Sequence, residues 1–323
     1  MNEADSEKIA AVLQQQGYKS AKKIGEADLV IINTCSVRQS AEDRVFGLIN
    51  NLVKKKKKRQ KIILTGCMFY HPLRWLREKL PHVDEFKKTE ELICHSPSAI
   101  RQSPIHAWVP ISQGCNHFCS YCVVPYARGR EKSRPFEEII CEVKELVQRG
   151  YKKITLLGQN VNSYKPSFAK LLKTLHKTPG IKKISFMTSN PWDLTSDIIE
   201  AMASPKIDRY LHLPVQSGDN EILKKMNRHY TAKDYLKLVK KIRQAIPDIK
   251  IGTDIIVGFP GETEEQFQNT LELCKKVGFT KAYLAKYSPR PGTTAFKMKD
   301  NVSPAEKNRR WRILEELINK KSR

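Results

Sequence analysis

Three closely spaced cysteines are the residues of this chain most able to do chemistry. Cys115, Cys119 and Cys122 follow the short apolar stretch Ala107-Trp-Val-Pro-Ile-Ser112, with the spacing Cys-x3-Cys-x2-Cys. Thiolates are the protein ligands of iron–sulfur clusters, and so tight a loop can present three sulfurs to three corners of a cubane. The fourth iron then lacks a protein ligand, and an open position on a metal is where substrate chemistry takes place. We therefore predict a 4Fe–4S cluster with one open iron at this loop.

Two other interpretations of the loop remain open from these residues alone, a structural zinc knuckle and three reduced thiols. Zinc requires a fourth Cys or His nearby. His117 is available, but it lies between two of the cysteines, where reaching the same ion is strained. The spacing and its position after an apolar strand favour the cluster.

Two further cysteines lie just past the ends of apolar stretches. Asp28-Leu-Val-Ile-Ile-Asn33 and Lys61-Ile-Ile-Leu-Thr65 are typical of buried parallel strands, and Cys35 and Cys67 follow them. Open α/β sheets bind their ligands at the carboxyl ends of the strands. Two thiols brought to one edge suggest a second metal centre. The other interpretation is two small buried residues at strand ends.

The composition favours an enzyme that meets a polyanion in a reducing compartment. Among 323 residues, 58 are Lys or Arg and 34 are Asp or Glu, a net charge of +24. Such an excess favours nucleic acid as partner, because neutralised phosphates release counterions. The run from Lys54 to Arg59, taken alone, is more typical of a solvated helix end. Eight cysteines, three of them clustered, indicate metal ligands rather than disulfides. A polar amino terminus and the lack of a long apolar run predict a cytoplasmic protein without a membrane span.

The chain divides near residue 100, at a polar, Pro-containing stretch over 95–104. Before it lie the two strands above, each followed by a helical pattern, over 41–52 and 72–80. After it, strand and helix patterns alternate six times. The predicted strands are 107–112, 152–157, 182–187, 208–213, 249–257 and 280–287. The predicted helices begin near Arg134-Pro135, Ser167, Leu194, Asp219 and Glu262, and a last basic, amphipathic helix runs from Pro304 to Lys321.

The fold class is therefore α/β, with an open parallel α/β sheet domain followed by a partial TIM-like (βα)6 barrel. In such barrels the working residues lie at the carboxyl ends of the strands. The three clustered cysteines follow the first barrel strand, as this rule requires.

Many motifs in order resemble one family, the radical S-adenosylmethionine (SAM) tRNA methylthiotransferases of the MiaB type. Those similar to the family's amino-terminal domain are Met1-Asn-Glu-Ala-Asp-Ser-Glu, Asn33-Thr-Cys-Ser-Val-Arg38 and Gly66-Cys67-Met68. Those similar to its radical SAM core are Cys115 to Cys122 with Val123-Val-Pro-Tyr-Ala-Arg-Gly-Arg-Glu131, Leu156-Leu-Gly-Gln-Asn-Val-Asn-Ser-Tyr164, Phe186-Met-Thr-Ser-Asn-Pro191, Leu211-His-Leu-Pro-Val-Gln-Ser-Gly218, Lys225-Met-Asn-Arg-His-Tyr230, Thr253-Asp-Ile-Ile-Val-Gly-Phe-Pro-Gly-Glu262 and Tyr287-Ser-Pro-Arg-Pro-Gly-Thr293. The resemblance implies a methylthiotransferase domain over 1–98 and a radical SAM core with its carboxyl-terminal helix over 101–323.

The resemblance also implies a reaction. A cluster on Cys115, Cys119 and Cys122 would bind SAM and cleave it to a deoxyadenosyl radical. The radical would remove hydrogen from carbon 2 of N6-isopentenyladenosine next to the anticodon of tRNA. Sulfur would come by way of an auxiliary 4Fe–4S cluster on Cys35 and Cys67, and a methyl group from another SAM. The implied partners are tRNA, an electron donor such as flavodoxin or ferredoxin, and a sulfur donor, with a monomeric enzyme.

Further residues are assigned to SAM through the resemblance. Tyr121 would flank the adenine, and Gly158, Gln159 and Asn160 would take the methionine amine and carboxylate. Ser189, Gln216 and Ser217, near the ends of the third and fourth barrel strands, are candidates for the SAM ribose or the substrate. The alternative for each polar residue is helix capping or hydrogen bonding within a loop.

The chain departs from the family at both ends. The family's first domain opens with a strand and a Gly-Cys-Gln ahead of the phrase that here begins at Met1, so the first strand and the third cysteine of the auxiliary cluster are missing from this sequence. We expect translation to begin upstream of Met1. Otherwise Cys35 and Cys67 take a ligand from elsewhere, with His71 the nearest candidate, or form no auxiliary cluster. The RNA-binding TRAM domain that usually follows the last helix is also missing.

Two other functions are therefore kept. The chain could act on threonylcarbamoyl-adenosine in tRNA, or be a tRNA-binding iron–sulfur protein, with or without SAM cleavage, that inserts no sulfur. Some residues match no role. Cys141 and Cys274 fall on apolar faces of predicted helices and are predicted to be core thiols, Cys94 fits no motif, and Arg128 and Asp254 suit an internal salt bridge.

Overall fold

The computed structural model describes residues 1–36, 39–57, 59–93 and 105–320, and the chain folds as two compact units. The first comprises Met1–Pro104 with Val123–Arg130, and the second Ile105–Cys122 with Glu131–Arg323. The expected boundary near residue 100 and the polar stretch 95–104 fall outside the described residues. The short segment that directly follows Cys122 is grouped with the first unit.

The first unit is built on a parallel sheet of three strands in the order β1-β2-β3. These strands are β1 (Leu29–Thr34), β2 (Lys61–Gly66) and β3 (Glu85–Phe86). The predicted strands 28–33 and 61–65 are confirmed, and the register pairs Thr34 with Gly66. Because these paired residues end their strands, Cys35 and Cys67 leave the sheet at the same edge.

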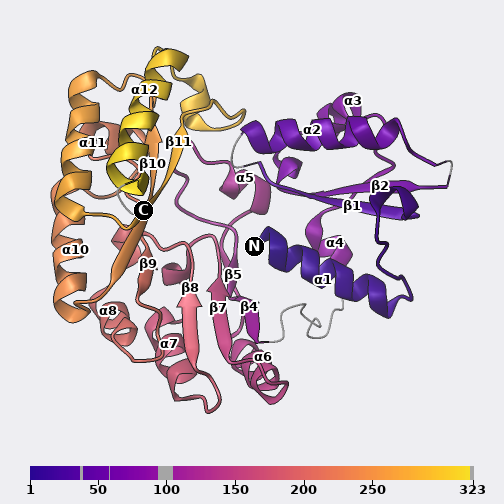
Figure 1. Cartoon of the computed structure of the whole chain (residues 1–323), viewed down its shortest axis with the longest axis horizontal. Helices are drawn as coiled ribbons and strands as arrows, with labels where there is room; N and C mark the ends of the chain where they lie inside the picture. The colour runs from indigo at the N-terminus through magenta and orange to yellow at the C-terminus, as the bar shows by residue number, and fades with distance from the viewer. Residues whose placement is uncertain (37–38, 58, 94–104, 321–323) are drawn as a thin grey trace. The chain divides into compact units, whose positions relative to one another are not determined.

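Helices cover both faces of this sheet. They are α1 (Asn2–Gln15), α2 (Gln39–Val53), α3 (Leu73–Lys79), α4 (Thr89–Ile93) and α5 (Val124–Arg128). In Figure 1, α2 lies along one face and α1 and α4 lie along the other. The core between them holds Val30, Ile32, Ile49, Leu52, Ile62, Leu64, Met68, Leu76, Leu80 and Val83. The apolar strands are thus buried on both sides, as their composition predicts.

Six parallel strands curve through the second unit, which confirms the predicted partial barrel. They are β4 (His106–Pro110), β7 (Lys153–Leu157), β8 (Lys183–Phe186), β9 (Tyr210–His212), β10 (Lys250–Val257) and β11 (Lys281–Lys286). Strands β4, β7 and β8 pair in that order, as do β9, β10 and β11. One parallel bridge from Ile184 to Ile207 joins the two sets. A short antiparallel pair, β5 (Ser112–Gln113) and β6 (Lys132–Ser133), directly precedes and follows the region of the three cysteines.

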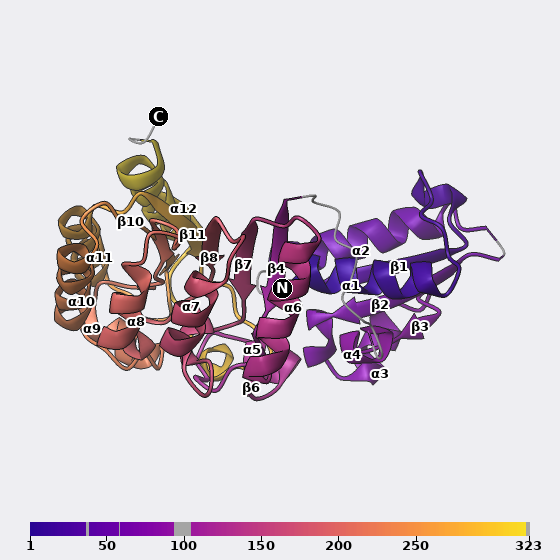
Figure 2. The same cartoon turned by 90° about the horizontal axis from the view of Figure 1, so that it is seen from below.

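The helices of the second unit run along the outside of the curved sheet (Figure 1 and Figure 2). They are α6 (Phe136–Gln148), α7 (Phe168–Lys177), α8 (Ser196–Met202), α9 (Asn220–Lys225), α10 (Ala232–Ala245), α11 (Glu264–Val277) and α12 (Pro304–Leu314), which continues as a π-helical turn over Glu315–Lys320. Ser167 and Asp219 cap α7 and α9, so both predicted helix starts are confirmed. The sequence missed the separate helix α10, which begins at a capping box of Thr231 and Asp234.

Candidate functional site

The loop that carries Cys115, Cys119 and Cys122 is held in shape by hydrogen bonds with Gln159, which follows β7, and Asn227, which follows α9. The Gly114 N–H donates to Gln159 Oε1 at 2.6 Å, at the end of β7. The Asn227 side chain donates from Nδ2 to the carbonyls of His117 and Phe118, both at 3.1 Å. Phe118 itself has a φ of 46°, a left-handed conformation that few bulky residues adopt. Hydrogen bonds from other segments therefore hold the conformation of this loop, in addition to any contribution from the cysteines.

The three thiols are free and partly buried. Burial raises the pKa of Cys115 to about 11, and the nearby Cys119 adds to this effect by charge repulsion. Iron binding must therefore displace a proton from Cys115. A cubane takes its cysteines at three separate iron corners, so its ligands stand farther apart than those of a single ion. In the described part of the chain, no three His, Cys, Asp or Glu residues are placed so that they could hold one metal ion.

Arg228 is a site residue that the sequence analysis placed in the motif 225–230 without assigning it a role. Its guanidinium is buried, and Nη1 lies 3.5 Å from Cys119 Sγ. Nη2 donates to the Pro214 carbonyl at 2.9 Å, and the guanidinium carbon lies 4.7 Å from the centre of the Trp192 ring. A buried cation thus lies beside a sulfur of the three-cysteine loop.

His117 has polar partners of its own. Its Nε2 lies 2.8 Å from Asp193 Oδ2 and 2.8 Å from Asn160 Nδ2, and its ring packs edge-on against Trp192. With Nε2 in these contacts, the zinc interpretation would use Nδ1 of the ring as the ligand atom.

The three residues after β7 have different surroundings. Gly158 is required by space, because a Cβ there would lie 2.5 Å from Ser112 Oγ. Gln159 accepts the hydrogen bond from the Gly114 N–H described above through its side-chain oxygen. Asn160 donates from Nδ2 to Asp193 at 2.6 Å, but its buried Oδ1 meets no hydrogen-bond donor among the described residues. A buried acceptor without a donor is unfavourable unless a ligand supplies one.

Gln216, in the loop that follows β9, shows the same feature. Its Oε1 is buried without a partner among residues that the structure describes, and its φ is 67°. Such strained positions concentrate at binding sites. By contrast, Ser189 Oγ donates to the His212 carbonyl at 2.5 Å, and Ser217 Oγ accepts from the Asp219 N–H at 3.2 Å. These two serines thus make the loop and cap contacts that were the alternative to a role in binding.

Tyr121 lies between Cys119 and Cys122 and packs against a small apolar cluster. The cluster consists of Ile222, Met226, Phe259, Tyr287 and Ala295. Burial raises the pKa of the Tyr121 phenol well above its ordinary value, so this side chain is a neutral, flat surface beside the cysteines.

Cys35 and Cys67 differ in exposure, Cys35 being exposed and Cys67 buried. The strand ends that carry them are in close contact. Thr34 Oγ1 donates to the Thr65 carbonyl at 2.6 Å and accepts from the Met68 N–H at 3.0 Å. Gly66 has a φ of 92°, and a Cβ there would lie 2.5 Å from both Asn33 Oδ1 and the Thr34 carbonyl. The edge is therefore built to bring the two cysteine-bearing loops together.

Arg128 closes this edge within the first unit. Its Nη2 donates to Asn2 Oδ1 at 2.6 Å and to Asp5 Oδ2 at 2.9 Å, and its Nε lies 3.4 Å from Cys67 Sγ. Asp254, in the second unit, instead lies 3.1 Å from His212 Nε2. Arg128 thus forms an ion pair with Asp5, and Asp254 contacts His212; the sequence indicated neither partner.

Several remaining residues can now be placed. His71 lies 3.3 Å from Glu42 through Nε2 and stacks on Trp75. Cys274 is buried, as predicted, and its pKa is raised to about 12 by burial. The prediction for Cys141 was wrong, because this thiol is exposed. The buried face of α6 is formed by Ile139, Ile140, Val143 and Leu146, which leaves Cys141 on the opposite side. Cys94 lies outside the described residues.

The barrel and the three-cysteine loop at its strand ends define the class of protein. Residues 109–274 match the radical SAM superfamily, and residues 1–87 match an uncharacterized protein family, UPF0004. The fold is similar to that of the radical SAM methyltransferase TsrM from Kitasatospora setae, with a TM-score of 0.67 over 90% of this chain and 73% of that one, at 14% identity.

Named relatives define the family more narrowly. The chain is 45% identical to the tRNA-2-methylthio-N(6)-dimethylallyladenosine synthase of Thermoanaerobacter sp. (strain X514), over 99% of this chain and 76% of the relative. It is 44% identical to the synthase of the same name from Clostridium tetani, over 99% of this chain and 79% of the relative. The chain belongs to this family of radical SAM tRNA methylthiotransferases, a class that uses SAM and a 4Fe–4S cluster. Across the described residues, no helix combines the length and apolar character needed to span a bilayer.

Proposed function

We propose that the protein methylthiolates carbon 2 of N6-isopentenyladenosine next to the anticodon of tRNA. The observation that carries the proposal is the placement of Cys115, Cys119 and Cys122 at the carboxyl end of the first barrel strand, in a chain of this family. Bound together, a 4Fe–4S cluster and SAM supply a deoxyadenosyl radical, which can remove hydrogen from a carbon that acid–base chemistry does not reach.

The residues around the loop fit a polar ligand at the strand ends. Asn160 and Gln216 present buried amide oxygens that lack donors among the described residues, and the SAM amine is a donor of the right charge. Tyr121 offers a flat neutral face for an adenine ring. Gln159, Ser189 and Ser217 support the loops, while Gly158 leaves space beside Ser112. We assign SAM binding to Asn160, Gln216 and Tyr121. The other four residues position the loops of the site.

Cys35 and Cys67 are proposed to hold the auxiliary cluster of the first unit. Their common strand edge and the close packing at Gly66 fit a shared centre. His71 Nε2 lies beside Glu42, which leaves Nδ1 of the same ring able to ligate a metal, so His71 stays a candidate for the third ligand. Cys35 and Cys67 are the only cysteines among the described residues of the first unit, and this favours the second candidate function, a SAM-cleaving tRNA-binding protein that inserts no sulfur.

The partners follow from charge and chemistry. A net charge of +24 suits tRNA. A low-potential donor such as flavodoxin or ferredoxin would reduce the cluster, and a separate sulfur donor would replenish the sulfur used. We propose that the enzyme acts as a monomer in the cytoplasm.

Anaerobic reconstitution tests the proposed site. We expect iron to bind and SAM to be cleaved under strong reductant, with both retained when Cys141 and Cys274 are changed to Ala. Changing Cys115, Cys119 and Cys122 to Ala should abolish cleavage while the circular dichroism spectrum is unchanged. Cleavage that persists in the triple variant contradicts the assignment.

A further inference from the structure

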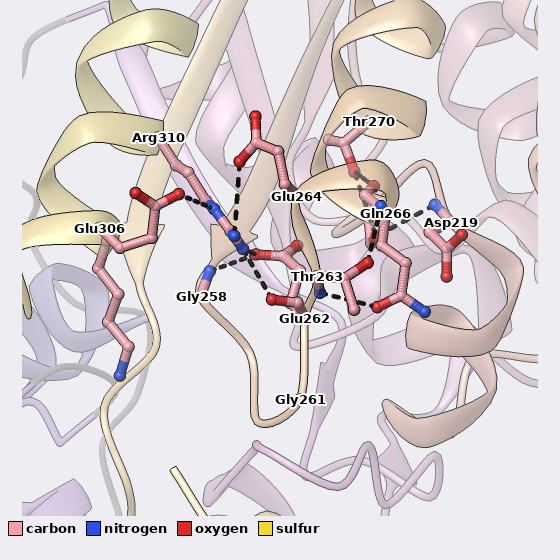
Figure 3. A network of polar contacts seen from close by, with 12 residues as sticks. Asp219, Gly258, Gly261, Glu262, Thr263, Glu264, Gln266, Thr270, Glu306 and Arg310 are labelled. Atoms are coloured by element: carbon pink, nitrogen blue, oxygen red, sulfur yellow. Dashed lines mark hydrogen bonds and ion pairs between the residues drawn. The ribbon is translucent and has the colours of Figure 1, made fainter. Parts of the chain in front are cut away.

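The loop between β10 and α11 is held by a buried ion pair from the last helix. Glu262 Oε2 accepts from the Gly258 N–H at 2.6 Å and from Arg310 Nη1 at 2.8 Å (Figure 3). The same Nη1 also donates to the Glu262 carbonyl at 3.0 Å. The side chains of Arg310 and Glu262 are 5% and 1% exposed, so water screens this pair very little.

The other nitrogens of Arg310 contact Glu306 on α12 and Glu264 on α11. Its Nε donates to Glu306 Oε1 at 2.7 Å, and Nη2 lies 3.6 Å from Glu264 Oε2. Its guanidinium carbon lies 5.3 Å from the centre of the Phe267 ring. One planar cation thus joins α12 to the loop and to the first turn of α11, a geometry that a lysine cannot reproduce.

Lys307, one turn before Arg310 on α12, packs directly beneath the loop. A Cβ at Gly258, whose φ is 67°, would lie 2.3 Å from Lys307 Cγ. Lys307 Nζ in turn donates to the Asp300 carboxylate at 2.7 Å. Helix α12 therefore contacts both ends of the loop, at Gly258 and at Glu262.

The loop also supports the cysteines. Phe259 is fully buried in the apolar cluster against which Tyr121 packs, and its ring lies 5.3 Å from that of Tyr287. Ser120, next to Tyr121, donates from N to the Met226 carbonyl at 3.1 Å and accepts from the Ala295 N–H at 2.7 Å. Met226 and Ala295 belong to the same cluster. Contacts therefore run without a break from Arg310 through Glu262 and Phe259 to the segment between Cys119 and Cys122.

We propose that Arg310 is a positioning residue for the SAM site, acting through Glu262 and the loop 258–262 to hold Phe259 in the apolar cluster against which Tyr121 packs. The proposal rests on the proposed function, in that Tyr121 and the cysteine loop form that site. Arg310 itself touches no reacting atom. Without it, the Glu262 carboxylate is buried with no cation to balance it, and the loop must move to reach water.

The test compares four variants for iron content, unfolding midpoint, and KM and kcat of SAM cleavage. Arg310→Met should raise KM for SAM about tenfold with kcat changed about twofold or less, because misplacing a binding wall weakens SAM binding without touching the cluster. Arg310→Lys keeps the charge and hence the fold, and should give a smaller increase in KM. The double variant Glu262→Gln with Arg310→Met removes the buried charge, keeps an acceptor for Gly258, and should restore most of the affinity. Arg309→Met, one residue away on the exposed side of α12, is the matched control and should leave KM unchanged.

The outcomes separate the two proposals. An unchanged KM in both Arg310 variants, whatever their stability, overturns the positioning role. The same rise in KM for Arg309→Met overturns it as well, because the effect would then be one of general charge. A native protein that neither binds iron nor cleaves SAM overturns the proposed function, and this inference with it.

Discussion

At the residue scale, the backbone is constrained most tightly beside the cysteines. Gly66 precedes Cys67, Phe118 precedes Cys119, and Gln216 lies in the loop after β9; all three have positive φ. At Phe118 and Gln216, which are not glycines, such conformations cost free energy and persist only where surrounding contacts fix them. The cysteine positions themselves follow from spacing and strand ends in the sequence. The strained neighbours do not, because their conformation depends on contacts between segments distant in the chain.

Gly66→Ala tests the close approach of the two strand ends. It should lower the free energy of unfolding by about 2 kcal/mol or more, because the new methyl group meets both an unfavourable φ and the Thr34 carbonyl. Gly17→Ala is the control, since Gly17 has a φ of 89° but no atom within 4 Å of the added Cβ. It should cost about 1 kcal/mol. Urea unfolding of both variants makes the comparison, and equal losses would mean that the contact at Gly66 is unimportant.

Gln216 and Ser217 offer a second matched pair. Gln216→Asn shortens the amide while tolerating the left-handed backbone, and should raise KM for SAM by about tenfold or more, as expected for one lost hydrogen bond to a charged group. Ser217→Ala should leave KM unchanged, because its hydroxyl already bonds to Asp219 and Thr270. Steady-state SAM cleavage distinguishes them. If only the Ser217 variant loses affinity, the assignment of Gln216 is wrong.

At the element scale, α12 is tied down by carboxylates on its own first turn and on α11. Hydrogen bonding from Arg309 lowers the pKa of Glu306 to about 2, from an ordinary value of 4.5. A lowered folded-state pKa contributes stability that is present above 4.5 and lost as pH falls toward 2. Because Glu306 is partly exposed, the contribution is about 1 kcal/mol or less.

The resulting prediction concerns the difference in free energy of unfolding between the native protein and the Glu306→Gln variant. Native protein should be slightly more stable than Glu306→Gln at pH 7, and the gap should shrink by about pH 3 as the native carboxylate loses its advantage. Urea unfolding of the apoprotein at several pH values measures the gap. A gap that widens in acid would reverse the sign of the shift and refute the role of Arg309.

The strands and most helices could be predicted because their patterns are local. Apolar runs such as Lys61–Gly66 and cap residues such as Ser167 and Asp219 fix their own segments. The break between α9 and α10 was missed because it depends on Asn227, whose left-handed φ of 57° is imposed by its bonds to the cysteine loop. Two ion-pair partners were missed for the same reason, Glu262 for Arg310 and Asp5 for Arg128, since each lies more than forty positions away along the chain.

At the scale of the whole molecule, the excess of positive charge is the main property that points to RNA. Affinity for tRNA should fall about tenfold or more when the salt concentration is raised about fourfold, because several phosphate contacts release counterions. SAM affinity of the same sample is the internal control and should change little. A flat salt response for tRNA would show that the net charge of +24 does not form a phosphate-binding surface.

The most direct test of the account is the nucleoside composition of tRNA. The chain should be expressed in cells that make N6-isopentenyladenosine but lack their own methylthiotransferase, and the digested tRNA analysed by mass spectrometry. The account predicts 2-methylthio-N6-isopentenyladenosine, and its loss when Cys115, Cys119 and Cys122 are changed to Ala. Unmodified isopentenyladenosine from cells whose purified protein cleaves SAM would contradict methylthiolation, and methylthiolated threonylcarbamoyl-adenosine would contradict the proposed substrate.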